Sequence, residues 1–335
     1  MTRPQEPSPA ALPTVDPLDT KATGDADAAL TAQGQPLARG FVLLKMALVV
    51  VGLALLLVWV GEGLPTQRPS LSVVALTVML YQVALYAAAL RLQGTLAAFG
   101  ITITARQALV IHLRSLFYFF FVPMSVGYEI TRFIAVRRID AAASVKQVVV
   151  ALLMDRVLGL LAALIALAAL AGMVLPASAW AEIDLTWILV IALAALVLGA
   201  AVMAHESPRR QVRDLLSALC PIWPRLALPT LYSLATLALV CASVFAFAIG
   251  SGIRVDWAPV TFALSASLLG MAVPVSLLGV TLGEVAGVGT LALIGLTPGV
   301  AVLLTSVAYC GRLFGAMQGA VIELWGDAGR MTRRA

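Results

Sequence analysis

Long apolar runs alternate with short polar segments along most of the chain. A helix needs about 20 apolar residues to cross the hydrocarbon core of a bilayer. Two further regions, 107–135 and 259–296, are apolar but interrupted by proline and glycine. The pattern predicts an all-α polytopic membrane protein with eight apolar regions, six of which are spanning helices. The predicted spanning helices cover residues 41–60, 71–90, 148–171, 185–204, 228–250 and 299–325.

The distribution of lysine and arginine among the loops predicts the orientation of the chain. Cytoplasmic loops of membrane proteins carry an excess of these residues. Segments 61–70, 172–184 and 251–258 contain at most one of them each, so we expect these loops on the outer face. We therefore expect a protein of the cytoplasmic (inner) membrane with both termini in the cytoplasm. The segments predicted to be cytoplasmic are richer in positive charge: 91–106, 137–146, 209–225 and 330–334.

The same loop assignments constrain the two interrupted regions. Region 107–135 lies between two segments predicted to be cytoplasmic, so it must enter and leave the membrane on the same face. Region 259–296 must return to the outer face if 299–325 crosses once. The sequence therefore predicts two re-entrant hairpins that dip toward each other from opposite faces. The alternative is that each arm crosses the membrane completely, and the second region is long enough to leave this open.

The two ends of the chain differ from the apolar part. Residues 1–40 hold six of the 17 prolines, have no apolar periodicity and carry five acidic and three basic residues, a net charge of −2. Such composition is typical of disorder. We predict a disordered cytoplasmic tail over 1–40, a membrane domain over 41–325 and a basic cytoplasmic tail over 326–335.

The composition excludes several classes of protein. Hydrophobic residues make up 61% of the chain and charged residues 12%, whereas about a quarter of a soluble domain is charged. A soluble enzyme and a disordered chain are therefore excluded. The net charge of +5 forms no separate basic stripe, so no nucleic-acid partner is expected. We expect no metal, cofactor or enzymatic activity, because metal-ligand spacings, an HExxH sequence and a phosphate-binding loop are all absent from the sequence.

The two interrupted regions share a sequence pattern. Each contains Val-Pro-x-Ser, then glycine, then glutamate. Glu129 precedes Arg156 by 27 positions, Glu284 precedes Arg312 by 28, and both arginines open an Arg-x-x-Gly sequence. These matches predict an inverted internal repeat with halves 41–175 and 185–325, the alternative being chance similarity in a chain rich in proline and glycine. The expected structural breaks are Pro123, Gly127, Pro274, Gly279 and Gly283.

The broken segments also predict a polar site. An irregular backbone at membrane depth is buried in protein or faces a water-filled cavity, and a helix N-terminus attracts anions. Arg312 lies mid-way along an apolar segment, where an ionised side chain needs a partner or a functional anion. We expect the carboxylates to neutralise the arginines of an empty site or to carry a proton. The candidate substrate-binding residues are Ser125, Glu129, Arg132, Asp155, Arg156, Ser276, Glu284 and Arg312.

Two structural alternatives stay open for these residues. Glu129 and Arg132 lie three positions apart, on one helix face, so they are also candidates for a structural ion pair. Asp155 and Arg156 lie near the predicted cytoplasmic start of a helix and are candidates for anchoring it to lipid headgroups.

These stretches resemble the lysylphosphatidylglycerol synthase transmembrane, flippase-like family of bacterial and archaeal membrane proteins. The similarity rests on 121–129 together with Arg132, on Asp-Arg-Val-Leu-Gly at 155–159, and on 273–284. It covers roughly residues 41–325. Stand-alone members of this family look like translocases of phospholipids, polyprenyl-linked carriers or hopanoid-type lipids.

The sequence departs from the family pattern at three positions. Tyr128 stands where a second glycine is usual, Glu129 replaces aspartate, and Gly283 stands where arginine usually precedes the glutamate. The missing arginine weakens a direct transfer of headgroup recognition. Fused members of the family carry a cytosolic aminoacyl-transferase domain. We expect no such synthase activity here, because only ten residues follow Trp325.

The resemblance and the candidate residues together favour a lipid translocase. We expect it to move a lipid with a phosphate-bearing or polar headgroup, without hydrolysing ATP itself. The expected partners are membrane lipid and enzymes of lipid or envelope synthesis. Two alternatives remain: a membrane-embedded lipid-modifying enzyme, and a non-transporting scaffold for a lipid-synthesis complex.

Overall fold

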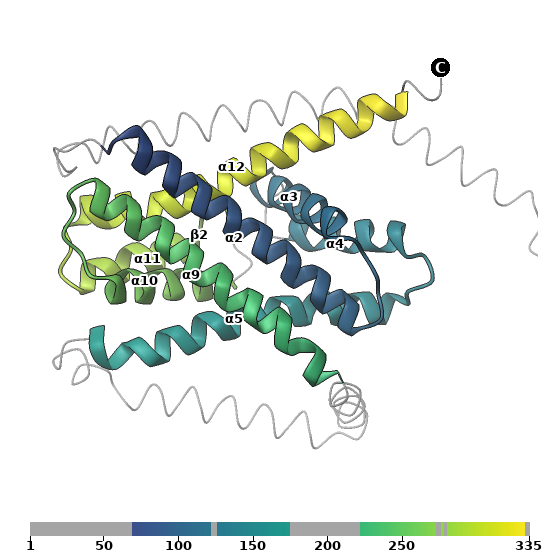
Figure 1. The fold of residues 1–335 in the computed structure, drawn as a ribbon, viewed down its shortest axis with the longest axis horizontal. Coiled ribbons are helices and arrows are strands. Elements are labelled where there is room, and N and C mark those ends of the chain that lie inside the picture. The colour runs from purple at the N-terminus through teal and green to yellow at the C-terminus, as the bar shows by residue number, and fades with distance from the viewer. Residues whose placement is uncertain (1–68, 122–125, 175–221, 273–275, 278–279, 332–335) are drawn as a thin grey trace, which may run out of the picture. The chain divides into compact units, whose positions relative to one another are not determined.

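The computed structural model describes residues 69–121, 126–174, 222–272, 276–277 and 280–331 (Figure 1). These residues are mostly helical, as the apolar pattern predicts. The first part contains α2 (Leu71–Ala98), α3 (Ala105–Phe121), α4 (Val126–Ile139) and α5 (Val145–Val174). The second part contains η2 (Trp223–Leu226), α9 (Ala227–Gly250), α10 (Trp257–Gly270), α11 (Leu282–Leu293) and α12 (Pro298–Met331), with the short strands β1 (Ser276–Leu277) and β2 (Val280–Thr281).

Four helical segments among the described residues are long and apolar enough to cross a membrane: Leu71–Ala98, Val145–Val174, Trp223–Gly250 and Pro298–Leu324. They coincide with four of the six predicted spans, which confirms an all-α membrane protein. The other two predicted spans, 41–60 and 185–204, and the predicted tail over 1–40 lie outside the described residues. α12 continues to Met331, so the predicted C-terminal tail over 326–335 begins as helix.

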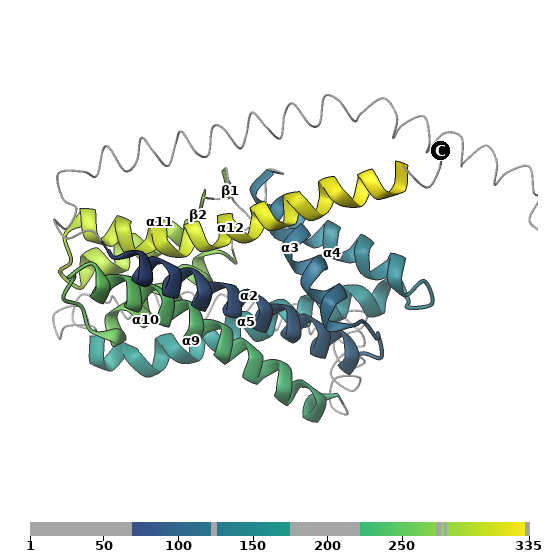
Figure 2. The same ribbon diagram turned by 45° about the horizontal axis from the view of Figure 1, so that its top comes forward.

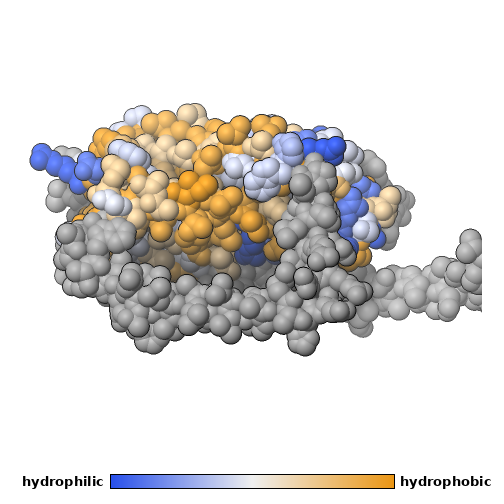
Figure 3. Space-filling view, turned by 90° about the horizontal axis from the view of Figure 1, so that it is seen from below, coloured by the Kyte–Doolittle hydropathy of each residue, from blue (hydrophilic) through white to orange (hydrophobic). Residues whose placement is uncertain are grey.

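Apolar side chains also cover the outside of these helices. Leu153 and Leu164 of α5 are 59% and 51% exposed, and Figure 3 shows hydrophobic residues over much of the middle of the described surface. Lipid chains are as apolar as leucine, so such a surface is stable in a bilayer and not in water.

Each interrupted region forms two short helices that pack against each other, α3 with α4 and α10 with α11. At a rise of about 1.5 Å per residue these helices are about 26, 21, 21 and 18 Å long, less than the roughly 30 Å of the hydrocarbon core. The break in the second region includes an antiparallel pairing of Ser276 with Thr281. Three predicted breaks, Pro123, Pro274 and Gly279, lie outside the described residues.

α2 and α9 lie side by side and run in opposite directions (Figures 1 and 2). Each hairpin packs against the last long helix of the other part, α3 against α12 and α10 against α5. Phe120 of α3 meets Tyr309 of α12 with ring centroids 5.5 Å apart, and Leu170 of α5 packs with Phe262 of α10. The two parts of the chain therefore share their packing surfaces.

A row of glycines brings α12 close to α2 and α3. Gly311, Gly315 and Gly319 are spaced four residues apart and share one helix face. A Cβ atom at Gly311 would lie 2.5 Å from the Tyr81 ring, and one at Gly319 would overlap the backbone carbonyl of Leu113. Small residues allow such close approach of membrane helices. This packing fixes the position of Arg312, which follows the first of the three glycines.

Candidate functional site

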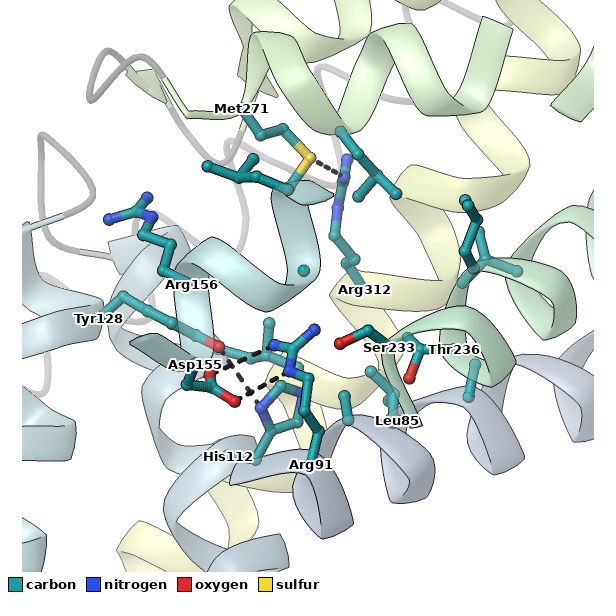
Figure 4. Close-up of a pocket in the computed structure, with 18 of the residues that line it drawn as sticks. Leu85, Arg91, His112, Tyr128, Asp155, Arg156, Ser233, Thr236, Met271 and Arg312 are labelled. Carbon is teal, nitrogen blue, oxygen red and sulfur yellow. Dashed lines mark hydrogen bonds and ion pairs between the residues drawn. The ribbon is translucent and has the colours of Figure 1, made fainter. Parts of the chain in front are cut away.

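A cavity of about 220 Å³ lies among α2, α3, α4, α5, α9, α12 and the end of α10 (Figure 4). Most of its wall is apolar, but four arginine side chains line it. Figure 4 shows Arg91, His112 and Asp155 grouped together, with Arg312 beside Met271 elsewhere on the wall. Charged side chains inside an apolar domain need partners of opposite charge, and ion pairs with carboxylates provide them here.

Asp155 of α5 is the acceptor for two arginines. Its carboxylate accepts a hydrogen bond from Arg91 Nε at 2.8 Å and another from Arg132 Nη1 at 2.8 Å. The side chains of Asp155 and Arg132 are 0% and 1% exposed. The Arg132 guanidinium also lies 4.4 Å from the centroid of the Tyr128 ring, and its Nη2 lies 3.3 Å from His112 Nδ1. Because a guanidinium only donates, Nδ1 is the acceptor in that contact.

A second ion pair joins α4 to α5. Arg156 Nη1 donates to Glu129 Oε1 at 3.1 Å. Both side chains are partly accessible, with 33% of Arg156 and 30% of Glu129 exposed. Glu129 lies in the first turn of α4, where a negative charge is favoured by the helix dipole.

A third ion pair joins α11 to α12. Arg312 Nη2 donates to Glu284 Oε1, and Arg312 Nη1 lies 2.8 Å from Met271 Sδ. The backbone N–H and hydroxyl of Thr281 donate to Glu284 Oε2 at 2.5 and 2.6 Å, and the Gly283 N–H donates to the Thr281 hydroxyl at 3.0 Å. These contacts form a capping box at the start of α11. The Arg312 and Glu284 side chains are only 10% and 12% exposed.

The second and third ion pairs join residues that the proposed repeat aligns. Glu129 and Glu284 each lie in the first turn of the second hairpin arm. Arg156 and Arg312 each lie on the long helix that follows. The contacts are therefore equivalent in kind, although the first pair is about three times as exposed as the second.

The charges of these three clusters do not cancel. Arg91, Arg132, Arg156 and Arg312 contribute four positive charges, against three negative charges from Glu129, Asp155 and Glu284. The Nε atoms of Arg132 and Arg312 are buried and have no hydrogen-bond partner in the described part of the chain. The excess positive charge belongs to arginines that line the cavity, so an anion is the ligand that this cavity fits best.

The structure brings most of the predicted site residues together. Glu129, Arg132, Asp155, Arg156 and Arg312 all line the cavity, and Glu284 contacts it through Arg312. Ser125 lies outside the described residues, and Ser276 is described only as part of β1.

The ion pairs join residues on different helices. The proximity of Glu129 and Arg132 along one helix makes them candidates for an ion pair with each other. In the structure Arg132 pairs with Asp155 of α5, and Glu129 pairs with Arg156 of α5. Asp155 is fully buried ten residues after the start of α5, so it does not anchor that helix to surface headgroups.

Several site residues were not predicted from the sequence. The charge pattern predicts Arg91 in a cytoplasmic loop, but α2 continues to Ala98 and includes Arg91. No sequence pattern indicates that His112 and Tyr128 line the cavity. Thr281 does lie in a recognisable pattern, because Thr281-x-x-Glu284 is the sequence signature of a capping box.

The family model described as "Lysylphosphatidylglycerol synthase TM region" matches residues 42–310. The chain belongs to this family. The match spans most of the chain and includes every cavity residue named above except Arg312, which lies two positions beyond it. Membership of the lysylphosphatidylglycerol synthase TM family fits a lipid-related role in a membrane. No curated protein and no solved structure matches the chain.

Proposed function

We propose that this chain translocates a lipid with a phosphate-bearing or other polar headgroup across the cytoplasmic membrane, without hydrolysing ATP itself. The observation that carries the proposal is the net positive cavity among the membrane helices, whose wall carries four arginine side chains as hydrogen-bond donors. A phosphate offers several acceptor oxygens to such donors. The lipid-related family supports the choice of a lipid as the carrier of that anion.

We propose further that the two halves of the membrane domain are inverted repeats. The helix contacts support this, because they occur in matching pairs: α3–α12 with α5–α10, α4–α5 with α11–α12, and α2–α5 with α9–α12. Inverted repeats with broken helices are a transporter arrangement in which the substrate site lies near the bilayer midplane. In this arrangement the hairpins re-enter from opposite faces and both termini are cytoplasmic.

Headgroup binding would exchange one partner of Arg312 for another. In this structure Glu284 neutralises Arg312. Removing one partner of a buried pair is strongly unfavourable, because it leaves an uncompensated charge. A headgroup phosphate that approaches Arg312 as Glu284 moves away keeps the arginine paired throughout. The headgroup then occupies the cavity while the acyl chains stay in the bilayer.

Proteoliposomes test this proposal directly. The purified protein is reconstituted with a headgroup-labelled fluorescent phosphatidylglycerol, and movement between leaflets is read by quenching the label from outside. We expect Arg312→Ala and Glu284→Ala to abolish movement. Arg254→Ala is the matched control, because Arg254 is exposed in the loop before α10 and does not line the cavity. Wild-type rates in both cavity variants, with folded protein, would overturn the site assignment.

We also propose that the chain does not modify its lipid chemically. Mass spectrometry of the vesicle lipids before and after incubation is expected to show unchanged masses. A new lipid species formed by the purified wild-type protein would instead identify a membrane-embedded enzyme. Stable co-purification with a lipid-synthesis enzyme, together with inert Glu284 and Arg312 variants, would identify a scaffold.

A further inference from the structure

A groove on the outside of the molecule meets the cavity at one ion pair. The groove lies between α4 and α5 and has a volume of about 300 Å³. Glu129 and Arg156 line both the groove and the cavity. Among the described residues, the charged side chains of the groove are therefore at its junction with the cavity, and the other lining residues are apolar: Ile130, Phe133, Val149, Leu152 and Leu153.

The apolar wall of the groove faces outward. Ile130, Val149 and Leu153 are 51%, 49% and 59% exposed. On a membrane domain such side chains contact lipid chains. The groove is thus an apolar channel, open to the bilayer, that leads to a polar cavity. A phospholipid has the same two parts in the same order, an acyl chain joined to an anionic headgroup.

We infer that the Glu129–Arg156 ion pair is the lateral opening of the cavity, and that one acyl chain of the bound lipid lies in the groove between α4 and α5. This inference rests on the proposed function, because it takes the cavity ligand to be a lipid headgroup. The inference is supported by the position of the ion pair, which lines both the cavity and the groove. A lipid with its headgroup in the cavity and one acyl chain in the groove would therefore pass beside these two side chains.

The geometry of the two equivalent ion pairs supports this assignment. Glu129 and Arg156 are about one-third exposed, so separating them exposes charges that already contact the surroundings. Glu284 and Arg312 are about one-tenth exposed, and Glu284 is held by two further hydrogen bonds from Thr281. The first pair is therefore the easier of the two to open.

Photo-crosslinking locates the acyl chain without requiring transport. The full-length protein is placed in vesicles of phosphatidylethanolamine and phosphatidylglycerol that contain phosphatidylglycerol with a diazirine in its acyl chain. We expect the label on peptides from α4 and α5. Leu153→Trp fills the groove and is expected to lower this labelling several-fold. Leu164→Trp is the control, since Leu164 is another exposed leucine of α5, 51% exposed against 59% for Leu153, and does not line the groove.

A reversible cross-link tests the opening itself. Ile130→Cys of α4 and Val149→Cys of α5, which line the groove and carry no charge, are combined in a chain in which Cys220, Cys241 and Cys310 are replaced by serine. A bifunctional thiol reagent that is cleaved by reduction should stop lipid movement in this double variant, and reduction should restore it. The single-cysteine variants treated with the same reagent are the controls.

The outcomes separate this inference from the proposed function. If the wild type moves lipid but Leu153→Trp keeps wild-type labelling and movement, the groove assignment is wrong and the translocase proposal stands. If the wild type moves no lipid, the translocase proposal fails, and labelling sensitive to Leu153→Trp still supports the groove as an acyl-chain site. Labelling spread evenly over the outer helices, unaffected by Leu153→Trp, overturns the inference in either case.

Discussion

Arg132 and Asp155 form a fully buried ion pair, with Nη1 and Oδ2 2.8 Å apart, and Arg91 binds the same carboxylate. Replacing Asp155 by alanine leaves two arginines without their common partner. Losing one member of a buried pair costs about 3–5 kcal/mol, so we expect Asp155→Ala to be strongly destabilised in thermal unfolding in detergent micelles. Glu129→Ala removes a carboxylate whose side chain is 30% exposed and should cost clearly less. Equal losses would contradict the central role of Asp155.

The hydroxyl of Thr281 is expected to support both α11 and the orientation of Glu284. Thr281→Val removes that hydroxyl at nearly constant volume and should cost about 1 kcal/mol, the usual value of an N-cap. It should also slow lipid movement, because Glu284 loses one of the bonds that hold it beside Arg312. Thr281→Ser keeps the hydroxyl and should retain both stability and movement. A Ser variant as impaired as the Val variant would show that the methyl group, not the hydroxyl, matters.

The close packing of α12 predicts that Gly319 tolerates no side chain. A Cβ atom there would overlap the backbone carbonyl of Leu113, and the backbone of α3 cannot move aside as a flexible side chain can. Overpacking of this kind costs about 1–3 kcal/mol, so Gly319→Ala should unfold at a lower temperature than the wild type. Gly289→Ala is the control, because nothing lies within 4 Å of a Cβ atom at Gly289. There alanine should be neutral or stabilising by about 0.5–1 kcal/mol.

The re-entrant arrangement predicts which loops share a face of the membrane. Thr102 and Ala142 flank the α3–α4 hairpin, Arg254 and Thr297 flank the α10–α11 hairpin, and all four residues are exposed. Single cysteines at these positions, in a chain without its native cysteines, are treated with a membrane-impermeant thiol reagent in intact cells and in inverted vesicles. We expect the first two to react from the cytoplasmic face and the last two from the opposite face.

Labelling of Thr102→Cys and Ala142→Cys from opposite faces would show that one arm crosses completely. It would also remove the topological basis of the inverted repeat, while leaving the described helix contacts unchanged.

The positions of the helices could be predicted from the sequence because each depends on a local property. Apolar runs of sufficient length located α2, α5, α9 and α12, and proline and glycine located the two breaks. The apolar pattern predicts a helix that ends at Leu90, before Arg91, whereas α2 continues eight residues further, to Ala98. Within the helix Arg91 is neutralised by Asp155, which lies 64 positions away along the chain. A local pattern contains no information about such a partner.

The sequence predicts most of the residues of the candidate site, but not which of them contact each other. Charges at membrane depth are rare, so Glu129, Arg132, Asp155 and Arg312 were identifiable one by one. Their pairing depends on which helix faces align, and the sequence indicated only the neighbour on the same helix, Arg132 for Glu129. The near-equal spacings of Glu129–Arg156 and Glu284–Arg312, 27 and 28 positions, are visible in the sequence, but only the fold shows that both pairs of residues form ion pairs.

The interlocking of the two parts has a consequence for biogenesis. α3 and α5 are synthesised before their packing partners α12 and α10. Phe120 contacts Tyr309, which follows 189 positions later, and Leu170 packs with Phe262, which follows 92 positions later. Until then lipid must cover surfaces that protein covers in the finished molecule. Insertion of α12 displaces that lipid and brings Arg312 to Glu284 in the same step. The polar site is therefore completed last, and a chain stopped before α12 lacks the arginine that neutralises Glu284.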